Sequence, residues 1–209
     1  MPRILSLGSR AATAEMIAEV REHLARGGVA VVPTDTIYGL AANALDPDAV
    51  AGVFALKGRD FDKALPVVVR DRTQAQVLAA ELPEPFQELT AEFWPGPLTL
   101  VLKAAAQVPP MLSAGTGTIA MRQPDLPWLA ALLASTGFPL TATSANRSGQ
   151  ASCRTAQEVL AQFGEACPLV VDAGMSPCAL ASTIVDLSAG KPRLVRAGAI
   201  ARERLARYL

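Results

Sequence analysis

The sequence predicts an α/β protein in which a twisted mixed β-sheet is flanked by helices. Short apolar runs rich in β-branched residues, typical of strands buried on both faces, alternate with segments of helical periodicity along the chain. This alternation is the pattern of an α/β architecture. A short connection joins the expected strands 182–186 and 193–196, which favours antiparallel pairing and therefore a mixed sheet.

Length and composition narrow the class of protein. The chain has 209 residues and is 51% hydrophobic, so we expect a single domain over residues 1–209. Lysine plus arginine and aspartate plus glutamate number 19 each, so the chain lacks the basic excess of a generic nucleic-acid binder. Three widely spaced cysteines without a CxxC pair argue against a disulfide framework or a zinc site. With no apolar run of about 18 residues and no signal-like N-terminus, we expect a cytoplasmic protein without membrane contact.

The first expected strand, 29–32, leads into a polar turn. Pro33 ends the strand because proline has no N–H to donate. Thr34, Asp35 and Thr36 follow at the carboxyl end of the strand, where ligands bind in open α/β sheets. These residue types also form turns by capping backbone donors, so the stretch alone leaves both interpretations open.

Helical periodicity and end signals define the remaining elements. Apolar spacing and a following Gly27-Gly28 predict the first helix, and Asp46-Pro47-Asp48 begins the second. Helices are expected over 13–26, 46–57, 73–82, 84–93, 126–136, 155–163 and 199–208. Further strands are expected over 65–69, 98–102, 118–122, 139–142, 169–171, 182–186 and 193–196. The long connections 104–117 and 172–181 are candidates for a lid.

Several familiar chemistries are excluded by their missing motifs. The chain has no dinucleotide-binding GxGxxG after a strand, no P-loop and no GxSxG turn. Its one histidine lies in the first helix, which argues against a Ser-His or Cys-His pair. What remains is a set of cations at loop or strand ends, with hydroxyl and amide side chains at similar positions. Such a set would bind a multiply charged anion. Catalysis would then rest on positioning and charge stabilisation, as in nucleotidyl transfer.

These residues fall into motifs that resemble the YrdC-like threonylcarbamoyl-AMP synthase family. The motifs are PTDTIYGL (33–40), KGR (57–59) with Lys63, FWPGPLTLVL (93–102), TIAMR (118–122), TSANRSG (143–149), STIVDL (182–187) and the late Arg196. Their order and spacing together are specific, and the similarity runs from about residue 13 to 200. The resemblance implies the short, single-domain form, with one concave, positively charged site on the mixed α/β fold.

The resemblance also implies an activity and a set of site residues. The expected enzyme is a nucleotidyltransferase that converts ATP, L-threonine and bicarbonate to threonylcarbamoyl-AMP and pyrophosphate, with Mg²⁺ carried by ATP. Its product would pass to tRNA threonylcarbamoyl-transferase proteins, and a weak contact with tRNA or another RNA is a further expectation. L-Threonine would be held by Thr36, Arg122, the backbone carbonyl of Ala142 and Ser182. ATP would be held by Lys57, Arg59, Lys63, Thr118, Ser144, Asn146, Ser152 and Arg196, with Lys57 and Arg59 the catalytic cations.

An RNA-binding module without catalysis is the main alternative function. A basic concave surface can hold the backbone of double-stranded RNA or tRNA. The zero net charge and the lack of interleaved aromatic and basic residues argue against this alternative.

Overall fold

The computed structural model describes residues 1–8, 14–58, 61, 63–178 and 180–209. Within those residues the chain folds as mixed α/β, which confirms the predicted fold class. The prediction did not anticipate that the strands divide into two mixed sheets. Among the described helices, none is both long enough and apolar enough to cross a bilayer.

The first sheet has the strand order β1-β9-β2-β3-β8. Its strands are β1 (Arg3–Ser6), β9 (Leu169–Asp172), β2 (Ala30–Val32), β3 (Gly39–Ala41) and β8 (Thr143–Ser144). Strand β9 pairs in parallel with β1 and β2, whereas β3 pairs antiparallel with β2 and β8. The turn between β2 and β3 carries the Thr-Asp-Thr stretch, so this stretch lies at one end of the sheet.

The second sheet has the strand order β11-β10-β5-β6-β4-β7. Its strands are β11 (Arg193–Arg196), β10 (Thr183–Asp186), β5 (Leu98–Lys103), β6 (Thr118–Arg122), β4 (Val67–Val68) and β7 (Leu140–Thr141). Strands β10 and β11 pair antiparallel, as predicted, while β10 pairs in parallel with β5. Strand β6 lies between β5 and β4, and its last residue is Arg122.

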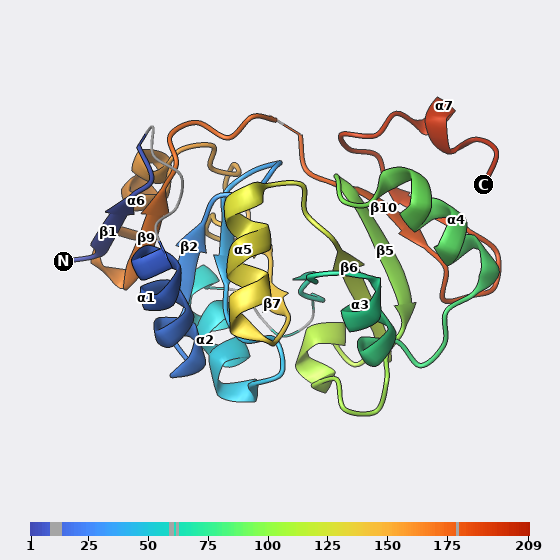
Figure 1. The fold of residues 1–209 in the computed structure, drawn as a ribbon, viewed down its shortest axis with the longest axis horizontal. Helices are drawn as coiled ribbons and strands as arrows, with labels where there is room; N and C mark the ends of the chain where they lie inside the picture. The colour runs from blue at the N-terminus through green and yellow to red at the C-terminus, as the bar shows by residue number, and fades with distance from the viewer. Residues whose placement is uncertain (9–13, 59–60, 62, 179) are drawn as a thin grey trace.

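Helices cover both sheets, and end signals in the sequence set several of their limits (Figure 1). They are α1 (Ala14–Ala25), α2 (Pro47–Lys57), α3 (Arg72–Leu78), α4 (Glu84–Phe93), α5 (Pro127–Thr136), α6 (Ala156–Phe163) and α7 (Arg202–Leu205), with 3₁₀ turns at Pro110–Ser113 and Gly164–Ala166. The Asp46 carboxylate accepts from the amides of Asp48 and Ala49 and so caps α2. Gly58 ends α2 at φ 59°, a left-handed conformation that favours glycine. Lys57, the last residue of α2, is thereby fixed beside the first sheet.

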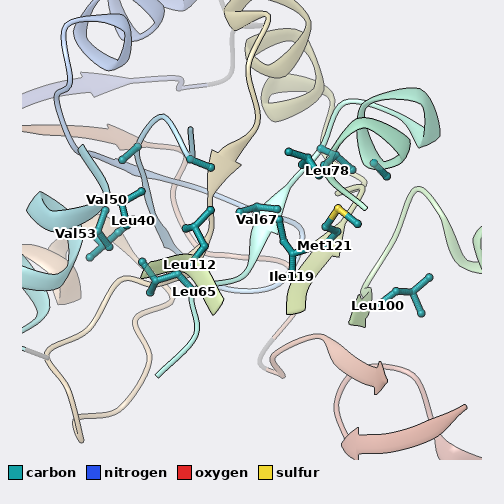
Figure 2. Packing of buried hydrophobic residues seen from close by; sticks show 14 of the residues in the cluster. Leu40, Val50, Val53, Leu65, Val67, Leu78, Leu100, Leu112, Ile119 and Met121 are labelled. Atoms are coloured by element: carbon teal, nitrogen blue, oxygen red, sulfur yellow. The ribbon is translucent and has the colours of Figure 1, made fainter. Parts of the chain in front are cut away.

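One hydrophobic cluster extends across both sheets. It includes Leu40 of β3, Val53 of α2, Val67 of β4 and Leu100 of β5, all fully or almost fully buried (Figure 2). A second cluster packs α1 and α5 against β2 and β9, with Leu24 and Leu132 among its members. Since close-packed interiors deform little, the shared core holds the two sheets in a defined relation. Polar residues at the edges of the two sheets can therefore form one site.

Candidate functional site

A pocket lies where the two sheets meet. From the first sheet it is lined by the turn that precedes β3 and by Ser144 of β8. From the second sheet it is lined by β4, by residues near the ends of β5, β6 and β11, and by the segment just before β10. Of the residues predicted to form the site, the pocket lining includes Thr36, Arg122, Ala142, Ser144, Ser152, Ser182 and Arg196. Residues separated by up to 160 positions in the sequence are thus brought to one pocket.

The wall from the first sheet is a turn held by its own hydroxyl groups. The Thr34 hydroxyl donates to the Ile37 carbonyl at 2.8 Å and accepts from the Thr36 amide at 3.1 Å. It also lies 2.9 Å from the Thr36 hydroxyl. Both threonines are buried, yet both line the pocket. Thr34 therefore acts as the turn-former, which leaves Thr36 as the hydroxyl presented to a ligand.

Arg122 and Asp35 form a buried ion pair that connects the two walls. Arg122 Nη1 donates to Asp35 Oδ1 at 2.5 Å, and the two side chains are only 7% and 9% exposed. Asp35 Oδ2 is buried and has no hydrogen-bond partner among the described residues. A guanidinium carries five N–H donors, so Arg122 keeps further donors after it binds Asp35. The carboxylate therefore fixes the orientation of a guanidinium that lines the pocket.

Ser182 and Arg196 form the opposite part of the second wall. Arg196 donates from Nε and Nη2 to the Ser182 carbonyl at 3.1 and 2.8 Å, and from Nη2 to the Ser182 hydroxyl at 3.2 Å. Desolvation and the nearby positive charge of Arg122 lower the pKa of the Arg196 guanidinium from its ordinary value. Both guanidinium groups line the pocket, and an anion bound there would relieve the repulsion between their charges.

Lys57 does not line this pocket; it holds a loop that does. Lys57 as a whole is only 3% exposed. Its ammonium group donates to the carbonyls of Ser144 and Asn146 at 2.5 and 2.9 Å. The Ser148 amide returns a bond to the Lys57 carbonyl at 3.0 Å. The end of α2 and the TSANRSG loop are therefore tied together at three points.

Of the remaining predicted residues, those that the structure describes lie outside the pocket lining. Asn146 is buried and donates to the carbonyls of Arg147 and Gln150, while Lys63 is exposed. Thr118 pairs with the Thr116 hydroxyl at 2.8 Å. Arg59 lies outside the described residues. The triphosphate role predicted for the cations near the end of α2 stays a prediction.

Two contributions to the pocket were missed by sequence reasoning. The sequence leaves Asp35 open between a ligand contact and a turn cap, and the structure pairs it with Arg122. Thr99 lines the pocket and lies 2.7 Å from the Ser182 hydroxyl. The signal for Thr99 was present, because it is a hydroxyl residue between Leu98 and Leu100 in an otherwise apolar strand. In a strand that alternates faces, such a residue points away from the core.

The described residues thus define an α/β protein with a polar ligand pocket that contains two guanidinium groups. The family model named Sua5/YciO/YrdC, described as telomere recombination, matches residues 22–198. The chain belongs to this family, which confirms the resemblance stated from its motifs.

Similar proteins and solved structures carry names that agree with this family assignment. The threonylcarbamoyl-AMP synthase of Pyrococcus abyssi is 37% identical over 183 residues, which are 88% of this chain and 54% of that protein. The threonylcarbamoyl-AMP synthase of Chromohalobacter salexigens is 36% identical over 179 residues, 86% of this chain and 96% of that protein. The structure of Pyrococcus abyssi Sua5 complexed with L-threonine matches 100% of this chain and 61% of that chain, with a TM-score of 0.94 and 33% identity. The chain spans little more than half the length of some curated relatives, and nearly all of others.

Proposed function

We propose that the chain is an L-threonylcarbamoyladenylate synthase, a nucleotidyltransferase that uses ATP, L-threonine and bicarbonate. The observation that carries this proposal is the convergence of Arg122, Ser182 and Thr36 on one pocket. An amino acid needs a cation for its carboxylate and hydroxyl groups for its polar atoms, and this set supplies both. The bound L-threonine in the similar Sua5 structure and the names of the curated relatives support the same substrate.

In this proposal the two walls divide the recognition of threonine. Arg122, already oriented by Asp35, donates to the carboxylate together with the Ser182 hydroxyl. The Ala142 carbonyl accepts from the amino group, and Thr36 contacts the substrate from the first wall. Each contact is made by a group that is buried or held by the backbone, so little conformational freedom is lost on binding.

The ATP side of the site would extend from the same pocket. Arg196, Ser144 and Ser152 line it, and we assign them to ATP together with Lys57, Arg59, Lys63, Thr118 and Asn146. Lys57 would act from behind the loop, where its charge favours phosphate beside Ser144. Mg²⁺ would arrive with ATP and neutralise phosphate charge, held chiefly by phosphate oxygens. The described residues offer no group of three His, Cys, Asp or Glu side chains that could bind it alone.

The reaction proceeds in two steps in this proposal. The threonine amine first combines with bicarbonate and loses water to give an N-carboxylate. An oxygen of this carboxylate then attacks the α-phosphorus, the bond to the bridging oxygen breaks, and pyrophosphate leaves. The residues of the pocket position the reactants and stabilise the negative charge on the departing pyrophosphate. A buried pocket also protects the labile carbamate from water.

The proposal includes the setting in which the activity is used. The product would pass to tRNA threonylcarbamoyl-transferase proteins in the cytoplasm, with at most weak direct contact to tRNA. We further propose that residues 1–209 act as one domain, and the hydrophobic cluster shared by the two sheets supports this. RNA binding without catalysis is not favoured by the named relatives.

A pyrophosphate-release assay tests the proposed function. The chain is incubated with ATP, Mg²⁺ and bicarbonate, with L-threonine, with L-serine, or with no amino acid. We expect release that depends on both bicarbonate and threonine, and threonylcarbamoyl-AMP as the nucleotide product by mass spectrometry. Release that ignores threonine, or salt-sensitive RNA binding with no release at all, would overturn the proposal.

A further inference from the structure

Thr99 faces the pocket because of its place in β5. Leu98 and Leu100 on either side of it belong to the hydrophobic cluster, and successive side chains of a strand point to opposite faces. Thr99 is therefore directed away from the core, and it is 2% exposed and lines the pocket. No backbone requirement explains a hydroxyl residue here, since neither a turn nor a cap lies at this position.

Among the described residues, the hydroxyl of Thr99 hydrogen-bonds with the Ser182 hydroxyl at 2.7 Å. Parallel pairing of β5 with β10 sets this distance, with Thr99 opposite Ile184 and Ser182 just before β10 begins. The position of Ser182 is fixed on its other side by Gly198. A Cβ on Gly198 would lie 2.4 Å from the Ala181 carbonyl oxygen, so only glycine allows this approach. The contact between the two hydroxyl groups is thus built into the fold.

The donors around Ser182 can be counted. A serine hydroxyl donates one hydrogen bond and accepts two. A guanidinium only donates, so Arg196 Nη2 occupies one acceptor position of the Ser182 oxygen. If Ser182 donated to Thr99, it would have no proton left for a ligand. If Thr99 donates to Ser182, both acceptor positions are filled and the Ser182 proton points elsewhere.

We propose that Thr99 is a positioning residue: its hydroxyl donates to Ser182 and thereby directs the Ser182 proton toward an anionic oxygen in the pocket. This inference rests on the proposed function, in which that oxygen belongs to the carboxylate of threonine. Arg196 and Thr99 act together, because each fills one acceptor position. Thr99 itself needs no contact with the substrate.

The test compares two substitutions of Thr99 that differ in which property they keep. Thr99→Val keeps the shape of the side chain and removes the hydroxyl, whereas Thr99→Ser keeps the hydroxyl and removes a methyl group. Thr99→Val loses the hydrogen bond from Thr99 to Ser182. This loss should weaken L-threonine binding by roughly three- to tenfold, as expected for one hydrogen bond, and leave the KM for ATP unchanged. Thr99→Ser should bind threonine nearly as the unaltered chain does.

A purely structural role for Thr99 predicts the opposite order of the two variants. If only packing mattered, Thr99→Ser would be the worse variant because it leaves a small gap, and Thr99→Val would be neutral. A double-mutant cycle adds a second readout: in a Ser182→Ala background, Thr99→Val should have no further effect on threonine affinity. An equal effect in both backgrounds overturns the inference.

Calorimetric titration of L-threonine, with melting curves as the fold control, separates this inference from the proposed function. Threonine binding that Thr99→Val leaves unchanged overturns the role of Thr99 alone, and pyrophosphate release by the unaltered chain then still supports the enzyme. No threonine binding by the unaltered chain overturns both.

Discussion

The two walls of the pocket are held in place by different kinds of interaction. In the first wall, Thr34 bonds to Thr36 and Ile37, its neighbours two and three positions away. In the second wall, Arg122 bonds to a carboxylate 87 positions away, and Thr99 to a hydroxyl 83 positions away. The first wall is therefore a local turn, and the second exists only when the sheets are assembled. The difference predicts that breaking the Asp35–Arg122 ion pair, which joins the two walls, affects the whole fold, whereas losing a bond inside the Thr34 turn affects only the turn.

Arg122→Gln should give the largest effect. Removing the guanidinium leaves the Asp35 carboxylate buried, and its Oδ2 has no partner among the described residues. Breaking a buried ion pair by removing one partner typically costs about 3–5 kcal/mol. We expect the free energy of unfolding to fall by that amount, and the affinity for L-threonine to be largely lost. Urea unfolding and calorimetric titration measure the two effects.

The control for Arg122→Gln is the double variant Asp35→Asn with Arg122→Gln. Because it buries two neutral amides instead of one charge, it should recover a large part of the lost stability while threonine binding stays weak. Arg193→Gln is a matched substitution at a more exposed ion pair, in which the Arg193 side chain is 75% exposed, and it should cost less than about 1 kcal/mol. Purely additive losses in the double variant would contradict a coupled pair.

Lys57→Met should give an intermediate effect, on stability as well as on the pocket. The substitution keeps a long apolar side chain but leaves the Ser144 and Asn146 carbonyls without their charged donor. Hydrogen bonds to charged groups contribute about 1.5–3 kcal/mol, and we expect a loss of that size in the free energy of unfolding. Hydrogen exchange should become faster at the Asn146 and Ser148 amides, which lie in the tethered loop.

Lys63→Met supplies the comparison for Lys57. Lys63 lies in the same connection but is exposed, so its removal should leave the free energy of unfolding nearly unchanged. If both variants lose ATP affinity while only Lys57→Met loses stability, the positive charges act on ATP independently of the bonds by which Lys57 holds the loop. Equal stability of the two variants would show that the bonds from Lys57 to the loop contribute little.

The same contrast between local and assembled structure decides what could be predicted from the sequence. The limits of 84–93 and 118–122 were predicted as observed, because local periodicity and flanking turn residues mark them. Strands β1, β3 and β8 were missed. Each is short, and β1 is a strand only through pairing with β9, more than 160 positions away. The closing helix was predicted over 199–208 but is limited to Arg202–Leu205.

The shortened closing helix has a tertiary cause. The Ala199 amide donates to the Ala181 carbonyl and the Ile200 amide to the Thr183 hydroxyl, at 3.0 and 2.9 Å. These bonds hold the backbone before the helix against β10, and the extended backbone of Ala201 (φ −65°, ψ 145°) lets the helix begin only at Arg202. Similarly, the sequence placed Arg122 and Ser182 at strand ends, but it could not show that Asp35 and Thr99 orient them. Partners far apart in the sequence leave no local pattern.

Thr36→Val should have a small effect on the fold, confined to the turn. Valine keeps the β-branched shape, and Thr34 retains its bonds to the Ile37 carbonyl and the Thr36 amide. Only the bond between the two hydroxyl groups is lost, so the free energy of unfolding should fall by about 0.5–1.5 kcal/mol. Thr34→Val removes all three bonds of this turn and should cost more, with faster hydrogen exchange confined to the turn. If Thr36→Val instead destabilised the chain as much as Arg122→Gln does, the first wall would be coupled to the whole fold. Its description as a local turn would then be wrong.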